Sequence, residues 1–210
     1  MQVKVMQLGM IGTNCYIFWD EEAKQCAVVD PGDHGDQVAA FLKGQGLEPV
    51  AILLTHSHFD HILGIPGLRA QWPELPIYCH PADVDEKKKT EELFGSVFPA
   101  IGSFGNISYY REGDTVNIGP IAVEVLETPG HTPGSVVLKT DGVLFTGDTL
   151  FRGSIGRTDL AGGNYAQIMV SLKKLAALEG DYHVCPGHEG MSTLNTERQS
   201  NYYMMQAAED

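Results

Sequence analysis

The chain of 210 residues is long enough to bury a hydrophobic core and has the size of a single domain. Its 43% hydrophobic and 20% charged residues exclude a disordered or fibrous protein. With a net charge of −13, the surface repels phosphate groups, so we expect neither nucleic acid nor a membrane as a partner. The one basic run, Lys87–Lys89, is followed by Glu91 and Glu92, which is typical of a solvated helix face.

The four cysteines are scattered and form no Cys-x-x-Cys pair. In a chain of this size they indicate reduced, mostly buried thiols. The sequence begins without an apolar stretch of signal-peptide length, and no apolar run approaches the length of a membrane-spanning helix. We therefore expect a cytoplasmic protein. Nothing in the sequence indicates its oligomeric state.

The first part of the chain alternates strand and helix patterns. We expect strands at Val3–Leu8, Asn14–Trp19, Cys26–Asp30, Val50–Leu54 and Ile77–Cys79, and helices at Asp36–Lys43, Ile62–Gln71 and Ala82–Leu93. The segment Phe94–Tyr110 combines glycines with phenylalanines, which indicates a loop with apolar anchors. Such a loop is either a surface connection or a lid over a pocket.

The second part begins with strands and ends with helices. We expect strands at Thr115–Ile118, Ile121–Glu127, Ser135–Lys139, Val143–Thr146 and Tyr182–Cys185, and helices at Tyr165–Leu178 and Asn195–Ala208. The order of elements indicates two similar halves. Strands that are apolar on both faces, with helices to cover them, predict an α/β (α+β) fold in which two sheets lie between helix layers. We predict one domain spanning residues 1–210.

Three of the eight histidines fall within six residues, in His56-Ser57-His58-Phe59-Asp60-His61. The cluster directly follows a predicted buried strand, where loops place side chains in a cleft. Packed imidazoles are costly to desolvate together, so this pattern favours metal binding over a structural role. Imidazole and carboxylate without thiolate suit zinc, iron or manganese. One ion cannot accept all four ligands in good geometry, so His56 and His58 share one ion while Asp60 and His61 face another.

Two ions need further ligands, and three candidates lie downstream. His131, Asp148 and His188 each follow a predicted strand and stand next to a glycine that allows a sharp turn. Their equivalent placement predicts that they join the first cluster.

In these motifs the whole chain resembles the metallo-β-lactamase superfamily, whose Asp30-Pro31-Gly32 motif is also present. The resemblance implies a four-layer αβ/βα sandwich of two mixed β-sheets with helices outside, and a site for two divalent metal ions at the edge between the sheets. The first ion takes His56, His58 and His131, the second takes Asp60, His61 and His188, and Asp148 bridges them. Asp30 is expected to position a ligand rather than to bind metal. The main class of zinc β-lactamases has cysteine where this chain has Asp148, so penicillin hydrolysis is not expected.

Within the superfamily, the segments 147–159 and 185–189 are similar to those of glyoxalase II, the hydroxyacylglutathione hydrolases. The short segment after His188 is similar to the single-domain bacterial type. The resemblance implies a dinuclear, zinc-dependent hydrolase of a small thioester resembling S-lactoylglutathione. A metal-bridging hydroxide would attack the carbonyl, Asp60 would orient it as the catalytic residue, and Arg157 would bind a substrate carboxylate. An ion pair of Arg157 with Asp159 is the alternative.

Other functions stay open. The Gly156-Arg157-Thr158-Asp159 string also resembles persulfide dioxygenases, which would use one Fe(II). A broad-specificity lactone or ester hydrolase would share the metal signature. The acidic charge argues against the RNA-processing nucleases of the superfamily. A non-catalytic metal-binding module would have a closed coordination shell.

Overall fold

The computed structural model describes residues 1–84 and 101–209. Its first sheet has six strands in the order β1-β2-β3-β4-β5-β6. The first three strands pair antiparallel, and β3 to β6 pair parallel. The elements of this half are β1 (Gln2–Leu8), β2 (Thr13–Trp19), β3 (Gln25–Val29), α1 (Gly35–Gln45), β4 (Glu48–Leu53), α2 (Phe59–Ile62), α3 (Ile65–Arg69), β5 (Ile77–Cys79), a 3₁₀ turn at Ile101–Phe104 and β6 (Ile107–Tyr109).

The second sheet also has six strands, in the order β14-β13-β10-β9-β8-β7. Only β10 and β13 pair parallel in it. A small hairpin of β11 and β12 lies beside it. The elements of this half are β7 (Thr115–Ile118), β8 (Ile121–Glu127), β9 (Val136–Thr140), β10 (Val143–Gly147), β11 (Leu150–Phe151), β12 (Ser154–Ile155), α5 (Tyr165–Ala176), β13 (His183–Pro186), β14 (Ser192–Thr193), α6 (Leu194–Ser200) and α7 (Tyr202–Glu209).

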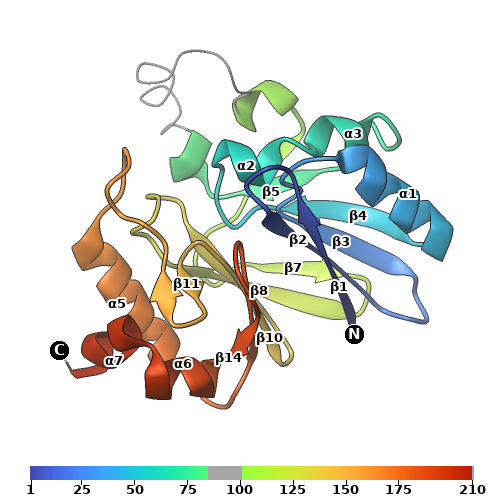
Figure 1. The fold of residues 1–210 in the computed structure, drawn as a ribbon. Coiled ribbons are helices and arrows are strands. Elements are labelled where there is room, and N and C mark those ends of the chain that lie inside the picture. The colour runs from blue at the N-terminus through green and yellow to red at the C-terminus, as the bar shows by residue number, and fades with distance from the viewer. Residues whose placement is uncertain (85–100, 210) are drawn as a thin grey trace.

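The two sheets face each other between two layers of helices (Figure 1). Strand residues alternate between faces, so Ile17 packs toward α1 while the neighbouring Phe18 packs between the sheets. In the second sheet, Phe145 packs between the sheets and Leu144 packs against the helices α5 to α7. These alternating contacts confirm the predicted four-layer sandwich, and all ten predicted strands are present within two residues of their expected bounds.

Two predicted helices are wrong in extent. Ile62–Gln71 is not one helix: α2 ends at Ile62 and α3 begins at Ile65, because the backbone N–H of Gly64 donates to Pro31 O at 2.8 Å instead of continuing the helix. Asn195–Ala208 is also divided, between α6 and α7 at Asn201. The buried Asn201 side chain donates to Ser154 O at 3.0 Å, and its backbone is extended. A side-chain contact outside the helix therefore decides where the helix breaks.

The predicted loop Phe94–Tyr110 lies partly outside the described residues, as does most of the predicted helix Ala82–Leu93 and all of Lys87–Lys89. The described end of the loop contains the 3₁₀ turn and β6. Of the phenylalanines expected as anchors, Phe104 is partly buried against the core, while Phe94 and Phe98 lie outside the described residues. Ile101 and Tyr110 in the described end are buried, and the Tyr110 hydroxyl donates to Leu54 O. The lid hypothesis stays a prediction.

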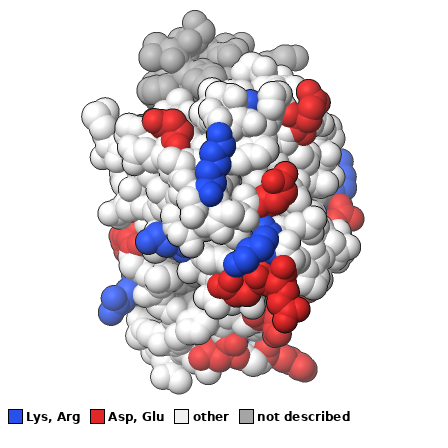
Figure 2. Space-filling view, turned by 90° about the vertical axis from the view of Figure 1, so that its right-hand side faces the viewer, with Lys and Arg blue, Asp and Glu red and all other residues white. Residues whose placement is uncertain are grey.

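The surface carries charges of both signs. On the face drawn in Figure 2, acidic and basic side chains of the described residues are interspersed, and no broad basic patch is visible. Within residues 1–84 and 101–209, no helix combines the length and the hydropathy needed to cross a bilayer. All four cysteines are buried and free, as the sequence predicts.

Candidate metal centre

The predicted ligands meet where loops of the two sheets come together. The cluster His56–His61 follows β4, while His131, Asp148 and His188 follow β8, β10 and β13. Backbone hydrogen bonds tie the loops across the two sheets: Val136 N donates to Thr55 O at 2.8 Å, and Asn14 N donates to Gly187 O at 2.7 Å. All seven residues named from the sequence are therefore at one edge of the sandwich.

The close packing of these loops requires glycine at position 187. A Cβ atom on Gly187 would overlap Asp148 Oδ1 and would lie 2.7 Å from His61 Cε1. Real Cβ atoms essentially never approach a neighbour so closely. The glycine before His188 thus allows the last loop to reach the other ligands.

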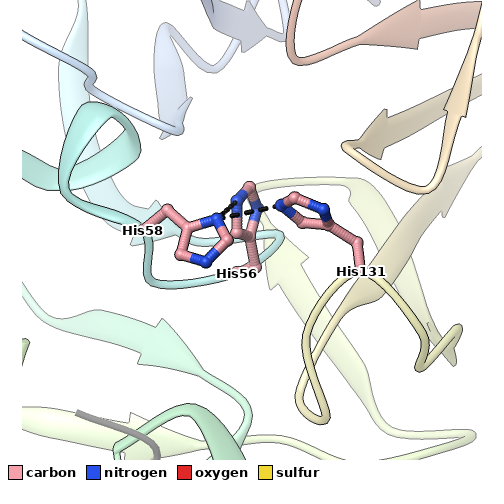
Figure 3. A group of neighbouring side chains, drawn as sticks. All are labelled: His56, His58 and His131. Atoms are coloured by element: carbon pink, nitrogen blue, oxygen red, sulfur yellow. Dashed lines mark hydrogen bonds between the residues drawn. The ribbon is translucent and has the colours of Figure 1, made fainter. Parts of the chain in front are cut away.

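Three ring nitrogens converge in one half of the site, which we call the imidazole half (His56, His58 and His131; Figure 3). His58 Nδ1 lies 3.1 Å from His56 Nε2 and 2.9 Å from His131 Nε2. His131 Nδ1 lies 2.7 Å from Arg157 O, a carbonyl that only accepts, so the proton of a neutral His131 is on Nδ1. Its Nε2 therefore presents a lone pair to His58.

The tautomer of His56 follows from the same reasoning. The Thr55 hydroxyl donates to Asp30 Oδ2 at 2.6 Å, so its oxygen accepts from His56 Nδ1, which is 3.2 Å away. His56 Nε2 is then also a lone pair. His58 Nδ1 can donate to only one of the two facing nitrogens, so this half contains more acceptors than donors.

The pKa values favour neutral imidazoles here. Burial lowers the pKa of His56 well below its ordinary value, and the neighbouring histidines add to the shift. Burial and the charge of His131 lower the pKa of His58 to about 4. At neutral pH both rings are therefore uncharged and can act as ligands.

The other half of the site, which we call the mixed half (Asp60, His61 and His188), contains both signs of charge. His188 Nε2 lies 3.2 Å and His61 Nε2 lies 3.8 Å from Asp60 Oδ2. Burial opposes ionisation of Asp60, but the hydrogen bond from His188 and the charge of His61 lower its pKa. Burial likewise opposes protonation of His188, yet Asp60 and Asp148 raise its pKa.

Asp148 lies between the two halves. Its Oδ2 is 3.5 Å from His131 Nε2 and 3.6 Å from His188 Nε2, and its Oδ1 is 3.4 Å from His61 Nε2. Burial opposes its ionisation, but the surrounding histidines, His61 above all, lower its pKa. The carboxylate is thus in contact with both groups of candidate ligands.

Asp30 positions His61, as expected from the sequence. Asp30 Oδ2 lies 3.0 Å from His61 Nδ1, and Asp30 Oδ1 accepts from Thr55 N at 2.8 Å. Although burial opposes protonation of His61, Asp30 and Asp148 raise its pKa well above the ordinary value. Because Asp30 holds Nδ1, the Nε2 atom of His61 faces the site.

The donor set fits divalent cations. Among the described residues, both ring nitrogens of His61 and Asp148 Oδ1 are buried and lack an aligned hydrogen-bond partner, an arrangement that costs free energy unless another group satisfies them. Three imidazole nitrogens in one half, and two imidazoles with a carboxylate in the other, are ligand sets that zinc, iron and manganese accept.

The structure places Arg157 differently from the other candidates. Its guanidinium donates two hydrogen bonds of 2.7 Å to Asp159, and its side chain is 61% exposed. This is the alternative that the sequence left open, and substrate binding by Arg157 stays a prediction. The Arg157 backbone carbonyl has a role that sequence reasoning missed, because it fixes the His131 ring.

Two further residues near the centre were missed. Asp83 is buried and accepts hydrogen bonds from the loops that carry His56, His58 and His131. His80 follows β5 and is buried, with Nε2 2.9 Å from Glu127 Oε1. His80 directly follows β5, which is a sequence signal for it, whereas Asp83 lies on the helical turn 81–84 and has no such signal.

Comparisons with known proteins agree with this geometry. The model of the metallo-beta-lactamase superfamily matches residues 8–188. A Bacillus subtilis protein named "Probable metallo-hydrolase YqgX" is 36% identical, with 97% of this chain and 98% of that protein covered. The hydroxyacylglutathione hydrolase GloC of Haemophilus influenzae is 30% identical, with 97% and 98% covered.

Solved structures show the same architecture. The BLEG-1 B3 metallo-beta-lactamase has a TM-score of 0.85 at 32% identity, covering 97% of this chain and 99% of that one. TTHA1623 in a di-iron-bound form has a TM-score of 0.82 at 34% identity, covering 95% and 99%. ETHE1 from Myxococcus xanthus has a TM-score of 0.80 at 26% identity, covering 96% and 84%.

Proposed function

Because the chain belongs to the metallo-β-lactamase superfamily, a group of metal-dependent hydrolases, we propose that it hydrolyses a small thioester. The observation that carries the proposal is the convergence of seven ligand residues from four loops on one edge of the sandwich. The similarity to a hydroxyacylglutathione hydrolase supports the thioester class. A structural metal site would not need so many ligands.

The imidazole half would hold one divalent ion and the mixed half a second, with Asp148 shared between them. We propose zinc as the native metal. Iron is the main alternative, because TTHA1623 at 34% identity has been solved with two irons. When bound, such a pair of ions lowers the pKa of water toward neutrality and polarises a carbonyl group.

Asp60 orients the attacking water and accepts its proton in this proposal. The contacts from Thr13 Oγ1 at 3.3 Å, His188 and His61 all engage Asp60 Oδ2. We therefore assign Oδ1 as the proton acceptor. A thiolate leaves without a strong general acid, which suits a site whose carboxylates have lowered pKa values.

Arg157 is proposed to bind a carboxylate of the substrate. Its carbonyl contacts His131, so its side chain starts at the edge of the metal centre. The guanidinium forms an exposed ion pair with Asp159, which is worth little and can be exchanged for a substrate carboxylate. S-lactoylglutathione is the substrate that we would assay first.

A substrate panel tests the proposal. Purified protein is assayed with S-lactoylglutathione, other acyl thioesters, lactones and nitrocefin, before and after chelation and after addition of zinc or iron. We expect thioester hydrolysis to be the fastest activity, to disappear on chelation and to return with metal. Activity that survives chelation contradicts the proposal.

Two other outcomes would replace it. Faster hydrolysis of lactones would assign a lactonase, and faster hydrolysis of nitrocefin would assign a β-lactamase, as in the similar BLEG-1 structure. Oxygen consumption with glutathione persulfide at one iron per chain would assign a persulfide dioxygenase. Of the three candidate ligand groups among the described residues, His56, His58 and His131 share no residue with Asp60, His61 and His188, which favours two ions over one.

A further inference from the structure

Asp83 is a buried carboxylate that has no part in the proposed reaction. It is 2% exposed and lies on a helical turn, 81–84, that follows β5. Such a group is found in a protein interior only where donors replace its lost hydration. Its donors therefore show what this residue does.

The donors come from two different loops. On one side, Ser57 N donates to Asp83 Oδ2 at 2.8 Å, and Ser57 Oγ donates to Asp83 O at 3.1 Å. On the other side, Gly134 N donates to Asp83 Oδ1 at 2.8 Å and Thr132 Oγ1 donates to Oδ2 at 3.2 Å. Asp83 thus joins the loop after β4 to the loop after β8.

These donors are neighbours of the imidazole ligands. Ser57 stands between His56 and His58, and Thr132 directly follows His131. The three imidazole nitrogens come from these two loops, so their separation depends on how the loops are held together. Among the described residues, the hydrogen bonds of the Asp83 carboxylate go to Ser57, Thr132 and Gly134 and not to the mixed half, which is instead supported by Asp30 at His61.

The fit around Asp83 leaves little room for another arrangement. A Cβ atom on Gly134 would overlap Asp83 Oδ1 and would lie 2.7 Å from Asp83 Cγ. Burial raises the pKa of Asp83, while the hydrogen bonds from Thr132, Ser57 and Gly134 act in the opposite direction. If the carboxylate were removed, the buried backbone amide of Gly134 and the partly buried amide of Ser57 would lose their acceptor.

We propose that Asp83 is a positioning residue that sets the geometry of the imidazole half and thereby its affinity for one of the two ions. This inference rests on the proposed metal-dependent function. Removing a group that orients metal ligands typically lowers metal affinity about 10–100-fold. The effect should be confined to one ion, because the mixed half has a separate support in Asp30.

Asp83→Asn tests the proposal, because the amide replaces one acceptor with a donor that faces a backbone N–H. Chelator competition with cobalt(II) measures the affinity of each ion, and the cobalt absorption spectrum reports its ligand geometry. We expect the affinity for one ion to fall about 10–100-fold and its spectrum to change, while the second ion stays within about twofold. Unchanged affinity for both ions, or an equal loss of both, overturns the proposal.

A matched control is Glu197→Gln. Glu197 is also a buried carboxylate that accepts from a backbone amide, that of Gly153 at 2.7 Å, but it lies on α6. We expect this variant to lose thermal stability while both metal affinities stay within about twofold. If Asp83→Asn does not fold, Thr132→Val removes one donor to the same carboxylate and should weaken the same ion severalfold.

Amide hydrogen exchange of the metal-free protein separates this proposal from the proposed function. In Asp83→Asn we expect the amides of Ser57 and Gly134 to exchange at least about tenfold faster, and the Gly153 amide to stay unchanged. This measurement needs no metal, so it tests the role of Asp83 in holding the two loops even if the wild-type chain binds no metal. Absence of metal binding by the wild type would refute the metal-dependent function. Equal exchange of Ser57 and Gly134 in both proteins would overturn the role of Asp83.

Discussion

The two halves of the metal centre are held in different ways. In the imidazole half the ring nitrogens lie about 3 Å apart, and the pKa values of His56 and His58 are both lowered. The mixed half contains ion pairs, in which Asp60, Asp30 and Asp148 surround His61 and His188. The mixed half therefore holds charges of both signs, whereas the imidazole half has more acceptors than donors, and a cation would satisfy the unpaired nitrogens and oxygens of both.

Asp60→Asn should have the largest effect on activity, because it removes the negative charge that pairs with His188 and the proposed proton acceptor. Acid–base catalysis contributes about 10²–10⁴-fold, so we expect kcat to fall by that factor. Steady-state kinetics with the best thioester measures it. His58→Ala removes a candidate ligand of the imidazole half, so it should lower metal content as well as activity. Full activity in Asp60→Asn would rule out the assigned role.

Asp30→Asn tests the support of the mixed half. It weakens the pairing with His61 Nδ1 while Asn retains an acceptor for Thr55 N. We expect affinity for one ion to fall about 10–100-fold, measured by chelator competition. Asp33→Asn is the control, because Asp33 is on the same loop but its side chain is 39% exposed. Asp33 Oδ1 accepts from His34 N at 2.7 Å, and Oδ2 lies 4.0 Å from His34 Nε2. Equal effects of the two substitutions would contradict a specific role for Asp30.

The imidazole half predicts a pH dependence of the metal-free protein. His58 has a folded-state pKa of about 4, below its unfolded value of about 6.5. Between these values the unfolded chain binds more protons, so stability is present above pH 6.5 and is lost as the pH falls toward 4. When the pH is lowered from 7 to 5, we expect the free energy of unfolding of His58→Gln to fall by about 1–2 kcal/mol less than that of the wild type.

Urea unfolding at the two pH values measures this difference. His183→Gln is the matched control, because His183 is an exposed histidine on β13. It should show the pH dependence of the wild-type chain. A His58 variant with the same pH dependence as the wild type would show that His58 is not buried as a neutral ring.

Arg157→Ala has the smallest expected effect. If its guanidinium leaves Asp159 to bind a substrate carboxylate, KM should rise about threefold to tenfold while kcat changes little. Arg152→Ala, which removes an exposed arginine from the β11–β12 turn, should leave KM unchanged. The same KM in Arg157→Ala and the wild type would limit Arg157 to its backbone contact with His131.

The parts of the fold that were predictable are those set by local patterns. Short continuous runs of apolar residues located strands such as β9 and β10, since each buries both faces in two different cores. The breaks at Gly64 and Asn201 were not predictable, because they depend on partners distant in the chain, Pro31 O and Ser154 O. The two-residue strands β11, β12 and β14 are too short to show a period.

The same distinction holds for the metal centre. His56, His58, Asp60 and His61 were identifiable because they stand within one short segment, and His131, Asp148 and His188 because each follows a strand. Asp83 was missed because a carboxylate in a polar, helix-like segment usually faces solvent. Its donors are backbone groups of loops after β4 and β8, and a sequence pattern does not display such contacts.

The central claim is that the site binds two metal ions, and counting and locating the bound ions tests it most directly. Crystals of the zinc-loaded protein, measured at the zinc absorption edge, would show where the ions bind. We predict two anomalous peaks, one among His56, His58 and His131 and one among Asp60, His61 and His188, with Asp148 reaching both. A chain that binds no zinc at this edge of the sandwich, or peaks located elsewhere, would contradict the account.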